Sequence, residues 1–414
     1  MEQQKRYISV LDIGTSKVLA LIGEVQDDDK INIVGLGQAP SRGLRAGMVT
    51  NIDATVQAIR QAVNDAELMA DTKITHVTTG IAGNHIRSLN SQGVVKIKDG
   101  EVTQADIDRA IETAKAINIP PDQKILDAVV QDYIIDTQLG VREPIGMSGV
   151  RLDTRVHIIT GASTAVQNVQ KCIERCGLKS DQIMLQPLAS GQAVLTEDEK
   201  DLGVCVIDIG GGTTDIAVYM NGAIRHTSVI PAGGNLITKD LSKSLRTPLD
   251  AAEYIKIHYG VASCDTEGLG EMIEVPGVGD RTSRQVSSKV LAAIISARIQ
   301  EIFGVVLGEL QKSGFPKEVL NAGIVLTGGV SMMTGIVEFA EKIFDLPVRT
   351  GAPQEMGGLS DRVRTPRFST AIGLLHAARK LEGNLPQPEN GAVQEREGGG
   401  GLLARLKRWI ENNL

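Results

Sequence analysis

Two short segments of the sequence place an aspartate just ahead of a glycine turn and follow the glycine with hydroxyl side chains. They comprise Asp12, Gly14, Thr15, Ser16 and Lys17 in the first segment, and Asp208, Gly210, Gly211, Gly212, Thr213 and Thr214 in the second. Glycines leave consecutive backbone N–H groups unshielded, and such groups suit phosphate oxygens. The hydroxyls and the one ammonium are further donors that phosphates use. Two such turns can hold a polyphosphate from both sides.

Three aspartates in or beside these segments are candidates for a magnesium site. Asp12 and Asp208 each end an apolar strand pattern before the glycines, and Asp215 follows the second turn. Carboxylates there would reach Mg²⁺, mostly through its water, beside the phosphates. A lone Asp-Ile-Gly is an ordinary turn more often than a site. The repetition favours nucleotide binding, together with a third turn after a strand pattern. The third turn consists of Gly328, Gly329 and Val330.

The elements that must position these residues are β-hairpins. Apolar patterns at Tyr7–Ile13 and Val18–Gly23 predict two strands around the first turn. Patterns at Val204–Asp208 and Asp215–Tyr219 predict the same arrangement around the second. The repeated hairpin predicts two similar halves that face each other across a cleft. No Gly-x-x-x-x-Gly-Lys-Ser or Gly-x-Gly-x-x-Gly joins a strand pattern to a helix pattern, so neither a P-loop nor a Rossmann site is supported.

Each half also carries an insertion. Residues 84–160 read as strand, helix, strand and strand, with Thr103 and Asp106 as an N-cap pair and a stop at Pro120-Pro121. The apolar stripe of that helix is Ile107, Ala110, Ile111, Ala114 and Ile117. Residues 223–313 form the second insertion, mostly helical by periodicity. The cores are then 1–83 with 161–194 in the first half and 195–222 with 314–381 in the second.

The C-terminal residues change in composition twice. Glycine, proline and polar residues dominate 382–401, which predicts a flexible linker. Residues 402–414 then predict an amphipathic helix with an apolar face flanked by cations, the pattern of a helix lying on an anionic membrane. The face and its cations are Leu402, Leu403, Arg405, Leu406, Lys407, Arg408, Trp409, Ile410 and Leu414. Docking of this helix on its own protein is the alternative, and the long tether counts against it.

Bulk properties exclude several classes of function. The 414 residues carry a formal net charge of -7 and 3% aromatic residues, so the chain has neither the charge nor the stacking surface expected for nucleic acid. The polar start, Met1–Tyr7, has no apolar core of a signal peptide, which predicts a cytosolic protein. Apolar runs such as Val290–Ile295 fall short of the ~20 residues that span a bilayer. Cys172 and Cys176, one helical turn apart, are expected to be reduced thiols.

Several stretches together resemble the bacterial cell-division FtsA family, within the actin, Hsp70 and sugar kinase superfamily. They are the two phosphate segments, Leu195–Glu197 leading into Gly203–Thr213, Gly323–Gly329, Phe368–Leu375 and the terminal amphipathic pattern. The resemblance implies an α/β, two-lobed actin-like (ribonuclease-H-like) fold with an inserted subdomain in each half. It also implies that the chain binds ATP with Mg²⁺.

The resemblance implies roles for further residues. The loop of Gly233, Gly234 and Asn235 would lie near the ribose and phosphates. Glu253 and Lys256, one helical turn apart, would clamp adenine and ribose, with a solvated helix face as the alternative. Gln186 would orient the attacking water, and Asp208 is the other catalytic candidate. Because an amide cannot accept a proton at neutral pH, we expect slow or negligible hydrolysis.

The resemblance also implies partners and a location. The 84–160 subdomain would serve self-association and later division proteins. A basic surface on the second insertion would dock the acidic C-terminal tail of the tubulin-like protein FtsZ, although a solvated basic rim is the alternative. Its residues are Arg281, Arg284, Lys289 and Arg298. The chain would then polymerise and tether FtsZ filaments, the Z ring, to the inner face of the cytoplasmic membrane at the division site.

Three other functions remain as alternatives. A pilus-assembly ATP-binding protein shares the fold but lacks a basic amphipathic tail. A sugar kinase needs a carboxylate base near an acceptor hydroxyl, and none is evident beyond the phosphate-site aspartates. An Hsp70-like chaperone needs a substrate-binding domain after the ATPase core, and few residues follow Leu381.

Overall fold

The computed structural model describes residues 5–27, 30–266, 268–354 and 356–384. The chain divides into two compact units, 1–379 and 380–414, and the first contains the fold described below except for the end of its last helix. Helix α11 (Ser369–Asn384) runs from the first unit into the second. The predicted linker after residue 384 and the predicted helix at 402–414 lie outside the described residues.

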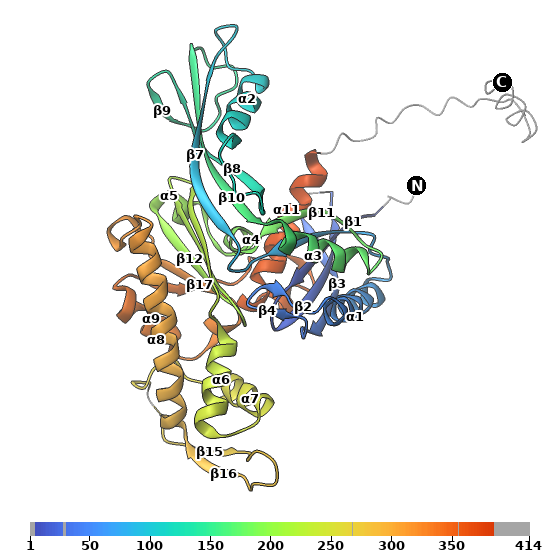
Figure 1. The fold of residues 1–414 in the computed structure, drawn as a ribbon, viewed down its shortest axis with the longest axis vertical. Coiled ribbons are helices and arrows are strands. Elements are labelled where there is room, and N and C mark those ends of the chain that lie inside the picture. The colour runs from blue at the N-terminus through green and yellow to red at the C-terminus, as the bar shows by residue number, and fades with distance from the viewer. Residues whose placement is uncertain (1–4, 28–29, 267, 355, 385–414) are drawn as a thin grey trace, which may run out of the picture. The chain divides into compact units, whose positions relative to one another are not determined.

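The first lobe is built on one mixed sheet (Figure 1). Three antiparallel strands form a meander, and two further strands are added in parallel next to the first. These strands are β1 (Arg6–Ile13), β2 (Lys17–Val25), β3 (Ile31–Pro40), β6 (His76–Ile81) and β11 (Lys179–Leu185). They lie in the order β11-β6-β1-β2-β3, and the short β19 (Gly357–Gly358) adds to the edge at β3. Strands β1 and β2 are nearly continuous buried runs because helices or the other lobe cover both faces of the sheet.

The second lobe repeats this topology. Its five strands lie in the order β14-β13-β12-β17-β18, a meander followed by two parallel additions. They are β12 (Val204–Ile209), β13 (Thr214–Met220), β14 (Ala223–Ile230), β17 (Ile324–Thr327) and β18 (Val348–Thr350). The two sheets therefore have the same strand order and directions. This confirms the two similar halves predicted from the repeated hairpin.

Helices pack on both sheets and between the lobes. Helix α1 (Ile52–Ala70) packs on β2 and β3 and begins where the Asn51 side chain accepts from the backbone N–H of Ala54. Helices α4 (Gln186–Val194) and α11 share the largest core cluster with strands of both lobes. Their backbones approach so closely that a Cβ on Gly373 would stand 1.8 Å from the carbonyl oxygen of Ala189. The lobes thus share a packed core.

The inserted subdomain of the first half is a four-stranded sheet with one helix. The strands are β7 (Arg87–Lys96), β8 (Gln123–Ile135), β9 (Gln138–Val141) and β10 (Arg151–Ala162), in the order β7-β10-β8-β9. Helix α2 (Gln104–Lys115) has the predicted capping box between Thr103 and Asp106, and it buries Ile107, Ala110 and Ala114 as expected. The helix ends at Lys115, ahead of the predicted stop at Pro120.

The second insertion differs from the predicted bounds. Residues 223–230 belong to the core sheet as β14, so the insertion begins after Ile230. It contains two strands as well as helices: α6 (Gly234–Leu245), α7 (Leu249–Tyr259), the hairpin of β15 (Met272–Val275) and β16 (Arg284–Ser287), and α8 (Ser288–Lys312). Among the described residues, α8 is the one helix long and apolar enough to cross a membrane. Its buried residues, including Leu291, Ile295 and Phe303, pack into the core of the second lobe.

The remaining short elements connect these parts. They are β4 (Leu44–Arg45), β5 (Met48–Val49), α3 (Ser163–Glu174), α5 (Glu197–Leu202), η1 (Lys317–Val319), η2 (Gly329–Met332), α9 (Ile336–Phe344), α10 (Ser360–Val363) and η3 (Pro366–Phe368). Helix α3 follows the inserted subdomain and leads into strand β11 of the first-lobe sheet.

Candidate functional site

The two predicted phosphate turns have the same backbone structure. The N–H of Gly14 donates to the carbonyl of Lys17 at 3.0 Å, and the N–H of Gly210 donates to the carbonyl of Thr213 at 2.9 Å. Each turn also lies between paired strand residues at the same spacing, Ile13 with Val18 and Ile209 with Thr214. The sequence repeat is therefore a structural repeat.

The turns meet face to face between the lobes. A Cβ on Gly211 would stand 1.8 Å from Oγ of Ser16, and a Cβ on Gly212 would stand 2.4 Å from Oγ1 of Thr15. The Ser16 hydroxyl also donates to Oδ1 of Asn235, at 3.3 Å. Glycine is needed in the second turn because side chains of the first occupy the space.

A cavity of about 460 Å³ opens beside the turns, a size that fits a small-molecule site. Most of the predicted nucleotide residues line it: Asp12, Gly14, Thr15, Ser16, Lys17, Gln186, Asp208, Gly210, Gly211, Gly212, Thr213, Asp215, Gly234, Glu253, Lys256, Gly328, Gly329 and Val330. Gly233 and Asn235 adjoin the second turn: a Cβ on Gly233 would stand 2.6 Å from the carbonyl oxygen of Gly210, and the N–H of Asn235 donates to the carbonyl of Gly211 at 2.8 Å.

Thr214 is the predicted residue that the structure turns away from the cavity. It is fully buried, and its hydroxyl donates to the carbonyl of Ala232 at 2.8 Å. Alternation along β13 explains this, because Thr213 and Asp215 face the cavity and the residue between them must point to the other side of the sheet.

Three buried carboxyl groups face the same cavity. Burial raises the pKa of Asp12 to about 6, with Asp208 acting in the same direction and the Lys17 ammonium against it. Burial also raises the pKa of Asp208, although it accepts hydrogen bonds from Ser190 at 2.5 Å and Thr370 at 3.1 Å. Burial and then Asp208 raise the pKa of Asp215 well above its usual range.

These carboxyls suit a hydrated cation. No three His, Cys, Asp or Glu side chains among the described residues converge closely enough to bind a metal directly. The sequence-based prediction of magnesium at Asp12, Asp208 and Asp215 would then require an ion held mostly through water. Oδ1 of Asp215 is buried without a hydrogen-bond partner in the described part of the chain, which fits a water or cation ligand.

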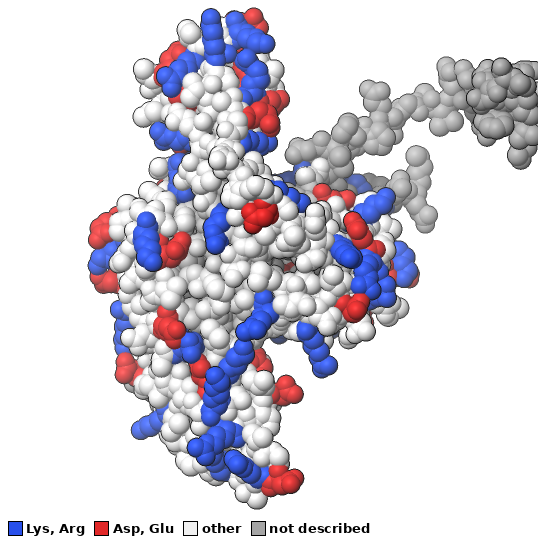
Figure 2. Space-filling model, viewed as in Figure 1, with Lys and Arg blue, Asp and Glu red and all other residues white. Residues whose placement is uncertain are grey.

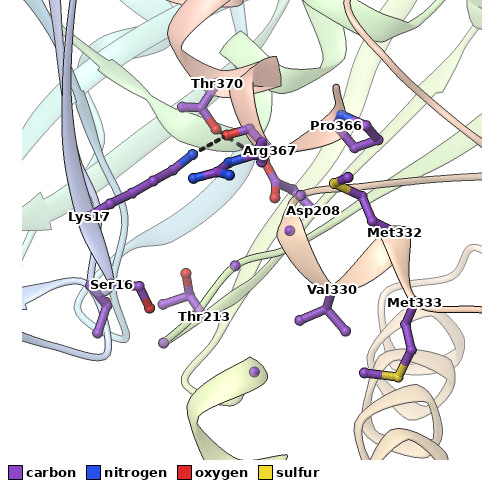
Figure 3. A pocket seen from close by; sticks show the side chains of 18 of the residues that line it. Ser16, Lys17, Asp208, Thr213, Val330, Met332, Met333, Pro366, Arg367 and Thr370 are labelled. Carbon is purple, nitrogen blue, oxygen red and sulfur yellow. Dashed lines mark hydrogen bonds between the residues drawn. The ribbon is translucent and has the colours of Figure 1, made fainter. Parts of the chain in front are cut away.

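Two cations, Lys17 and Arg367, lie close together at the cavity, near Asp208 (Figure 3). The Lys17 ammonium donates to the carbonyl of Arg367 at 2.7 Å and lies 4.6 Å from the ring centre of Phe368. Burial first, and then the guanidinium of Arg367, lowers the pKa of Lys17 to about 8. Two adjacent cations that face a cavity favour an anionic ligand. Arg367 was missed by sequence reasoning, and its place directly before Phe368–Leu375 is the signal that could have found it.

Gln186 lies where a water-orienting amide was predicted. Its Nε2 donates to Oδ1 of Asp12 at 3.0 Å, which fixes the direction of the amide. The amide oxygen remains free to accept a hydrogen bond from a water, but it is not basic enough to remove a proton from that water.

The far end of the cavity is apolar on one side and polar on the other. Val330, Met332 and Met333 lie on the apolar side (Figure 3). The backbone at Gly328 has a φ of +84°, and a Cβ there would stand 2.3 Å from Oδ1 of Asp208, so this turn requires glycine. Met332 and Met333 were not predicted, although only Ser331 separates them from the third glycine turn.

Glu253 and Lys256 form the polar side. The Lys256 ammonium donates to Oε2 of Glu253 at 2.6 Å, to Oγ1 of Thr238 at 2.9 Å and to the carbonyl of Gly234 at 3.2 Å. Lys256 is buried, while the Glu253 side chain is 41% exposed. The pair is thus part of the cavity wall, not a solvated helix face.

Known proteins resemble the chain over its whole length. A family model for the cell division protein FtsA matches residues 205–373, and one for the SHS2 domain inserted in FtsA matches 83–160. The cell division protein FtsA of Neisseria meningitidis serogroup B is 99% identical, with all of both chains covered. The chain belongs to the FtsA family. The FtsA proteins of Pseudomonas aeruginosa (51% identical, covering 100% of this chain and 99% of that one) and Escherichia coli K12 (42%, covering 99% of each) agree.

Solved structures place this FtsA-family chain in the actin-like fold. A PilM–PilN type IV pilus biogenesis complex aligns with a TM-score of 0.64 and 18% identity, covering 90% of this chain and 98% of that one. MreB5 of Spiroplasma citri, solved with AMPPNP, aligns with a TM-score of 0.56 and 15% identity, covering 92% and 98%. The predicted fold class is therefore confirmed.

The FtsA-family chain has its predicted partner-binding cations on the second insertion. Figure 2 shows Lys and Arg side chains gathered at the end of the molecule where Figure 1 places β15 and β16. Arg284 donates to the carbonyl of Leu245. Arg298 pairs with Asp240 and Glu301, at 2.6 Å each. Arg281 and Lys289 are exposed, and their side chains form no hydrogen bond or ion pair within the described residues.

Proposed function

We propose that the chain binds ATP with Mg²⁺ in this cavity. The observation that carries the proposal is the pair of equivalent turns that meet between the lobes, each preceded by a buried aspartate. Unshielded N–H groups and two adjacent cations suit the phosphates. The buried carboxyls and the unpartnered oxygen of Asp215 suit the hydrated metal. Magnesium would supply charge neutralisation between these carboxyls and the phosphates.

The chain's own residues favour binding over rapid turnover. Gln186 can orient a water beside Asp12, but an amide is not a general base. Asp208 is held by Ser190 and Thr370, so its role is to order the water around the metal. We therefore expect slow or negligible hydrolysis.

Two variants test the site. Asp208→Ala removes a carboxylate of the metal site. Gly329→Val adds a side chain at a cavity position where a Cβ meets no protein atom within 4 Å, so the fold should tolerate it. Each should weaken fluorescent ATP binding about tenfold or more. Gly308→Val on α8, where a Cβ is equally free, is the matched control. Wild-type affinity in both folded site variants would refute the assignment.

At the cellular level we propose an ATP-bound scaffold of division. The chain would polymerise and tether FtsZ filaments to the inner face of the cytoplasmic membrane at the division site. It would recruit later division membrane proteins through the inserted subdomain. Membership of a family of cell-division proteins supports this proposal.

The FtsZ-tail surface can be tested by charge reversal. Arg284 and Arg298 already have protein partners, so an acidic peptide would meet Arg281 and Lys289 first. Arg281→Glu with Lys289→Glu should weaken binding of the tail peptide and flatten its salt dependence. Lys171→Glu on α3 is an exposed control of the same charge change. Unchanged affinity in the double variant would remove this surface from the proposal.

The membrane anchor can be tested separately. We propose that Leu402–Leu414 binds anionic membranes as an interfacial helix, with Trp409 on its apolar face. One short helix binds weakly, so polymerisation would supply avidity. Co-sedimentation with anionic vesicles should be lost on truncation after Gly383 and reduced by Trp409→Glu. Parent-like pelleting of either variant would show that another segment is the anchor.

A further inference from the structure

The inserted subdomain belongs to the first half of the chain, but it also contacts the second lobe along β14. Strand β14 is an edge strand of the sheet that the structure describes in this lobe, so one side of its backbone is open to other groups. Side chains of β7 and β8 donate to three of its carbonyls, and we call this set the β14 contact. Its bonds run from Oγ of Ser88 to Thr227 at 2.8 Å, from Nδ2 of Asn90 to Arg225 at 3.1 Å and from Nε2 of Gln131 to Ile224 at 2.7 Å.

His157 of β10 lies at the centre of the β14 contact and is 1% exposed. Its Nδ1 lies 2.7 Å from Oδ1 of Asn90, and its Nε2 lies 3.0 Å from Oγ1 of Thr227. The Asn90 oxygen can only accept, so Nδ1 carries the ring proton and Nε2 accepts from the Thr227 hydroxyl. Burial lowers the pKa of His157 to about 4, which keeps the ring neutral. Hydrogen-bonded networks of this kind rigidify the groups they join.

Two ion pairs extend the contact between the subdomain and the second lobe. Arg225 of β14 lies 3.2 Å from Asp132 of β8, and both side chains are largely buried. Arg142, directly after β9, pairs with Asp201 of α5 at 2.6 Å. The subdomain is thus held to the second lobe by side chains from several of its strands.

The strand that receives these bonds leads to the second phosphate turn. Strand β14 ends at Ile230, and the carbonyl of Ala232 accepts from the Thr214 hydroxyl at the start of β13. The N–H of Gly234 then donates to the carbonyl of Gly210 at 2.9 Å. A shift of β14 relative to the first lobe would therefore move the backbone of the second turn.

The root of the subdomain leads to the first phosphate turn. The chain leaves the first lobe at Gly83, where φ is +141°. Gly47 packs against this root, since a Cβ on Gly47 would stand 2.7 Å from the carbonyl oxygen of Ala82 and 3.0 Å from Cα of Gly83. Gly47 also lines the cavity, and its N–H donates to Oγ1 of Thr15 at 3.0 Å. The subdomain is therefore connected to both turns.

We propose that the inserted subdomain couples the nucleotide cavity to the β14 contact. This inference rests on the proposed ATP site. The phosphate turns meet, with Ser16 bonded to Asn235, at the same orientation of the lobes at which the β14 contact forms. Each contact then favours the orientation that the other needs, and such coupling is reciprocal. ATP strengthens the β14 contact, and loss of that contact weakens ATP binding.

The first test measures ATP affinity by titration with a fluorescent analogue. Asn90→Ala removes bonds to His157 and to β14, and the affinity should fall about fivefold. Gln92→Ala is the matched control on the same strand, because the Gln92 amide donates to Asp153 within the subdomain. It should bind ATP as the parent does. Thr227→Val should resemble Asn90→Ala, whereas Thr227→Ser keeps the hydroxyl and should keep the affinity.

The second test measures amide hydrogen exchange, which reports local opening. Exchange of 223–230 should slow severalfold when ATP binds the parent, relative to α2, which packs only within the subdomain. This slowing should disappear in Gly329→Val, whose cavity is blocked. Asn90→Ala should speed exchange of 223–230 even without nucleotide.

The outcomes separate this coupling from the proposed function. Parent-like ATP affinity in folded Asn90→Ala and Thr227→Val would overturn the coupling alone. An equal loss of affinity in Gln92→Ala would trace the effect to subdomain stability and would also overturn it. A parent that binds no ATP would refute the proposed function and the coupling with it. Thermal melts of the ligand-free variants identify any that fail to fold.

Discussion

The first and second phosphate turns have the same backbone and opposite side-chain chemistry. The first carries Thr15, Ser16 and Lys17, and the second carries a run of glycines before Thr213. The contact between them explains the difference, because Ser16 fills the space that a Cβ on Gly211 would need. When two equivalent hairpins meet, only one can carry side chains at the contact.

Their charges differ for a related reason. In register, Asp12 pairs with Leu19 in the first hairpin, while Asp208 pairs with Asp215 in the second. The first turn thus balances its carboxyl with Lys17, and the second has two carboxyls and no cation of its own. Burial raises the pKa of both carboxyls, and a cation bound beside them would favour their ionised form, so the proposed magnesium belongs at the second turn.

The largest expected effect comes from placing a side chain on the second turn. Gly211→Ala puts a methyl group 1.8 Å from Oγ and 2.9 Å from Cβ of Ser16, so the Ser16 side chain must move or the turns must separate. Overpacking of this kind costs about 2 kcal/mol or more. We expect ATP affinity to fall roughly thirtyfold or more, measured by titration with a fluorescent analogue.

Two controls locate this effect in the contact. Gly304→Ala makes the same change on α8, where a Cβ meets nothing within 4 Å, and should leave affinity unchanged while stabilising the helix by about 0.5–1 kcal/mol. Adding Ser16→Gly to Gly211→Ala moves the side chain from one turn to the other and should recover part of the affinity. Full affinity in folded Gly211→Ala would contradict the contact.

The sequence predicted the turns but not their fit. Repetition of strand, aspartate and glycine is a local pattern, so it identified Asp12 and Asp208 correctly as neighbours of one cavity. Thr214 was misplaced because a run of two threonines does not show which one points inward. Its counterpart in the first hairpin by register, Val18, is buried, and comparison of the two hairpins would have revealed this.

Other parts of the site depend on tertiary contacts that no local pattern encodes. Arg367 reaches the cavity because η3 lies against the first turn, where the carbonyl of Arg367 accepts from Lys17. Thr238 connects to Glu253 and Lys256 only because α6 and α7 pack side by side. The β14 strand was assigned to an insertion because its periodicity does not show that it pairs with β13.

A smaller effect on ATP affinity is expected from a change of pH, and it should come mainly from the titratable groups of the first turn. Binding of magnesium and phosphate needs an ionised Asp12 and a protonated Lys17. The pKa of Asp12 is about 6 and that of Lys17 is about 8, so affinity should be highest between these values. Loss of either charged group should weaken MgATP binding about tenfold. Titrations from pH 5 to 9 give the profile.

Variants show which residue causes the fall in affinity at low pH and which causes the fall at high pH. Lys17→Arg keeps its charge at all these pH values and should flatten the alkaline limb. Asp12→Asn should flatten the acid limb in part, since burial raises the pKa of Asp208 as well. A profile that is level from pH 5 to 9 in the parent would show that neither group of the first turn controls binding.

The smallest expected effect is on the stability of the ligand-free protein, where the two aspartates should differ. The pKa of Asp12 is raised to about 6, so the folded protein retains a proton that the unfolded chain releases between about pH 4 and 6. Asp12 therefore contributes stability at low pH that is lost as the pH rises through about 6. Asp12→Asn should stabilise the protein by about 1 kcal/mol at pH 7.5 and flatten the pH dependence of its stability.

Asp208→Asn should stabilise the protein less, because Oδ2 of Asp208 accepts hydrogen bonds from both Ser190 and Thr370 and the new amide adds donors without partners. Thermal unfolding at pH 5 and 7.5 measures both changes. Equal gains in the two variants would mean that the hydroxyl contacts of the second turn do not distinguish it from the first.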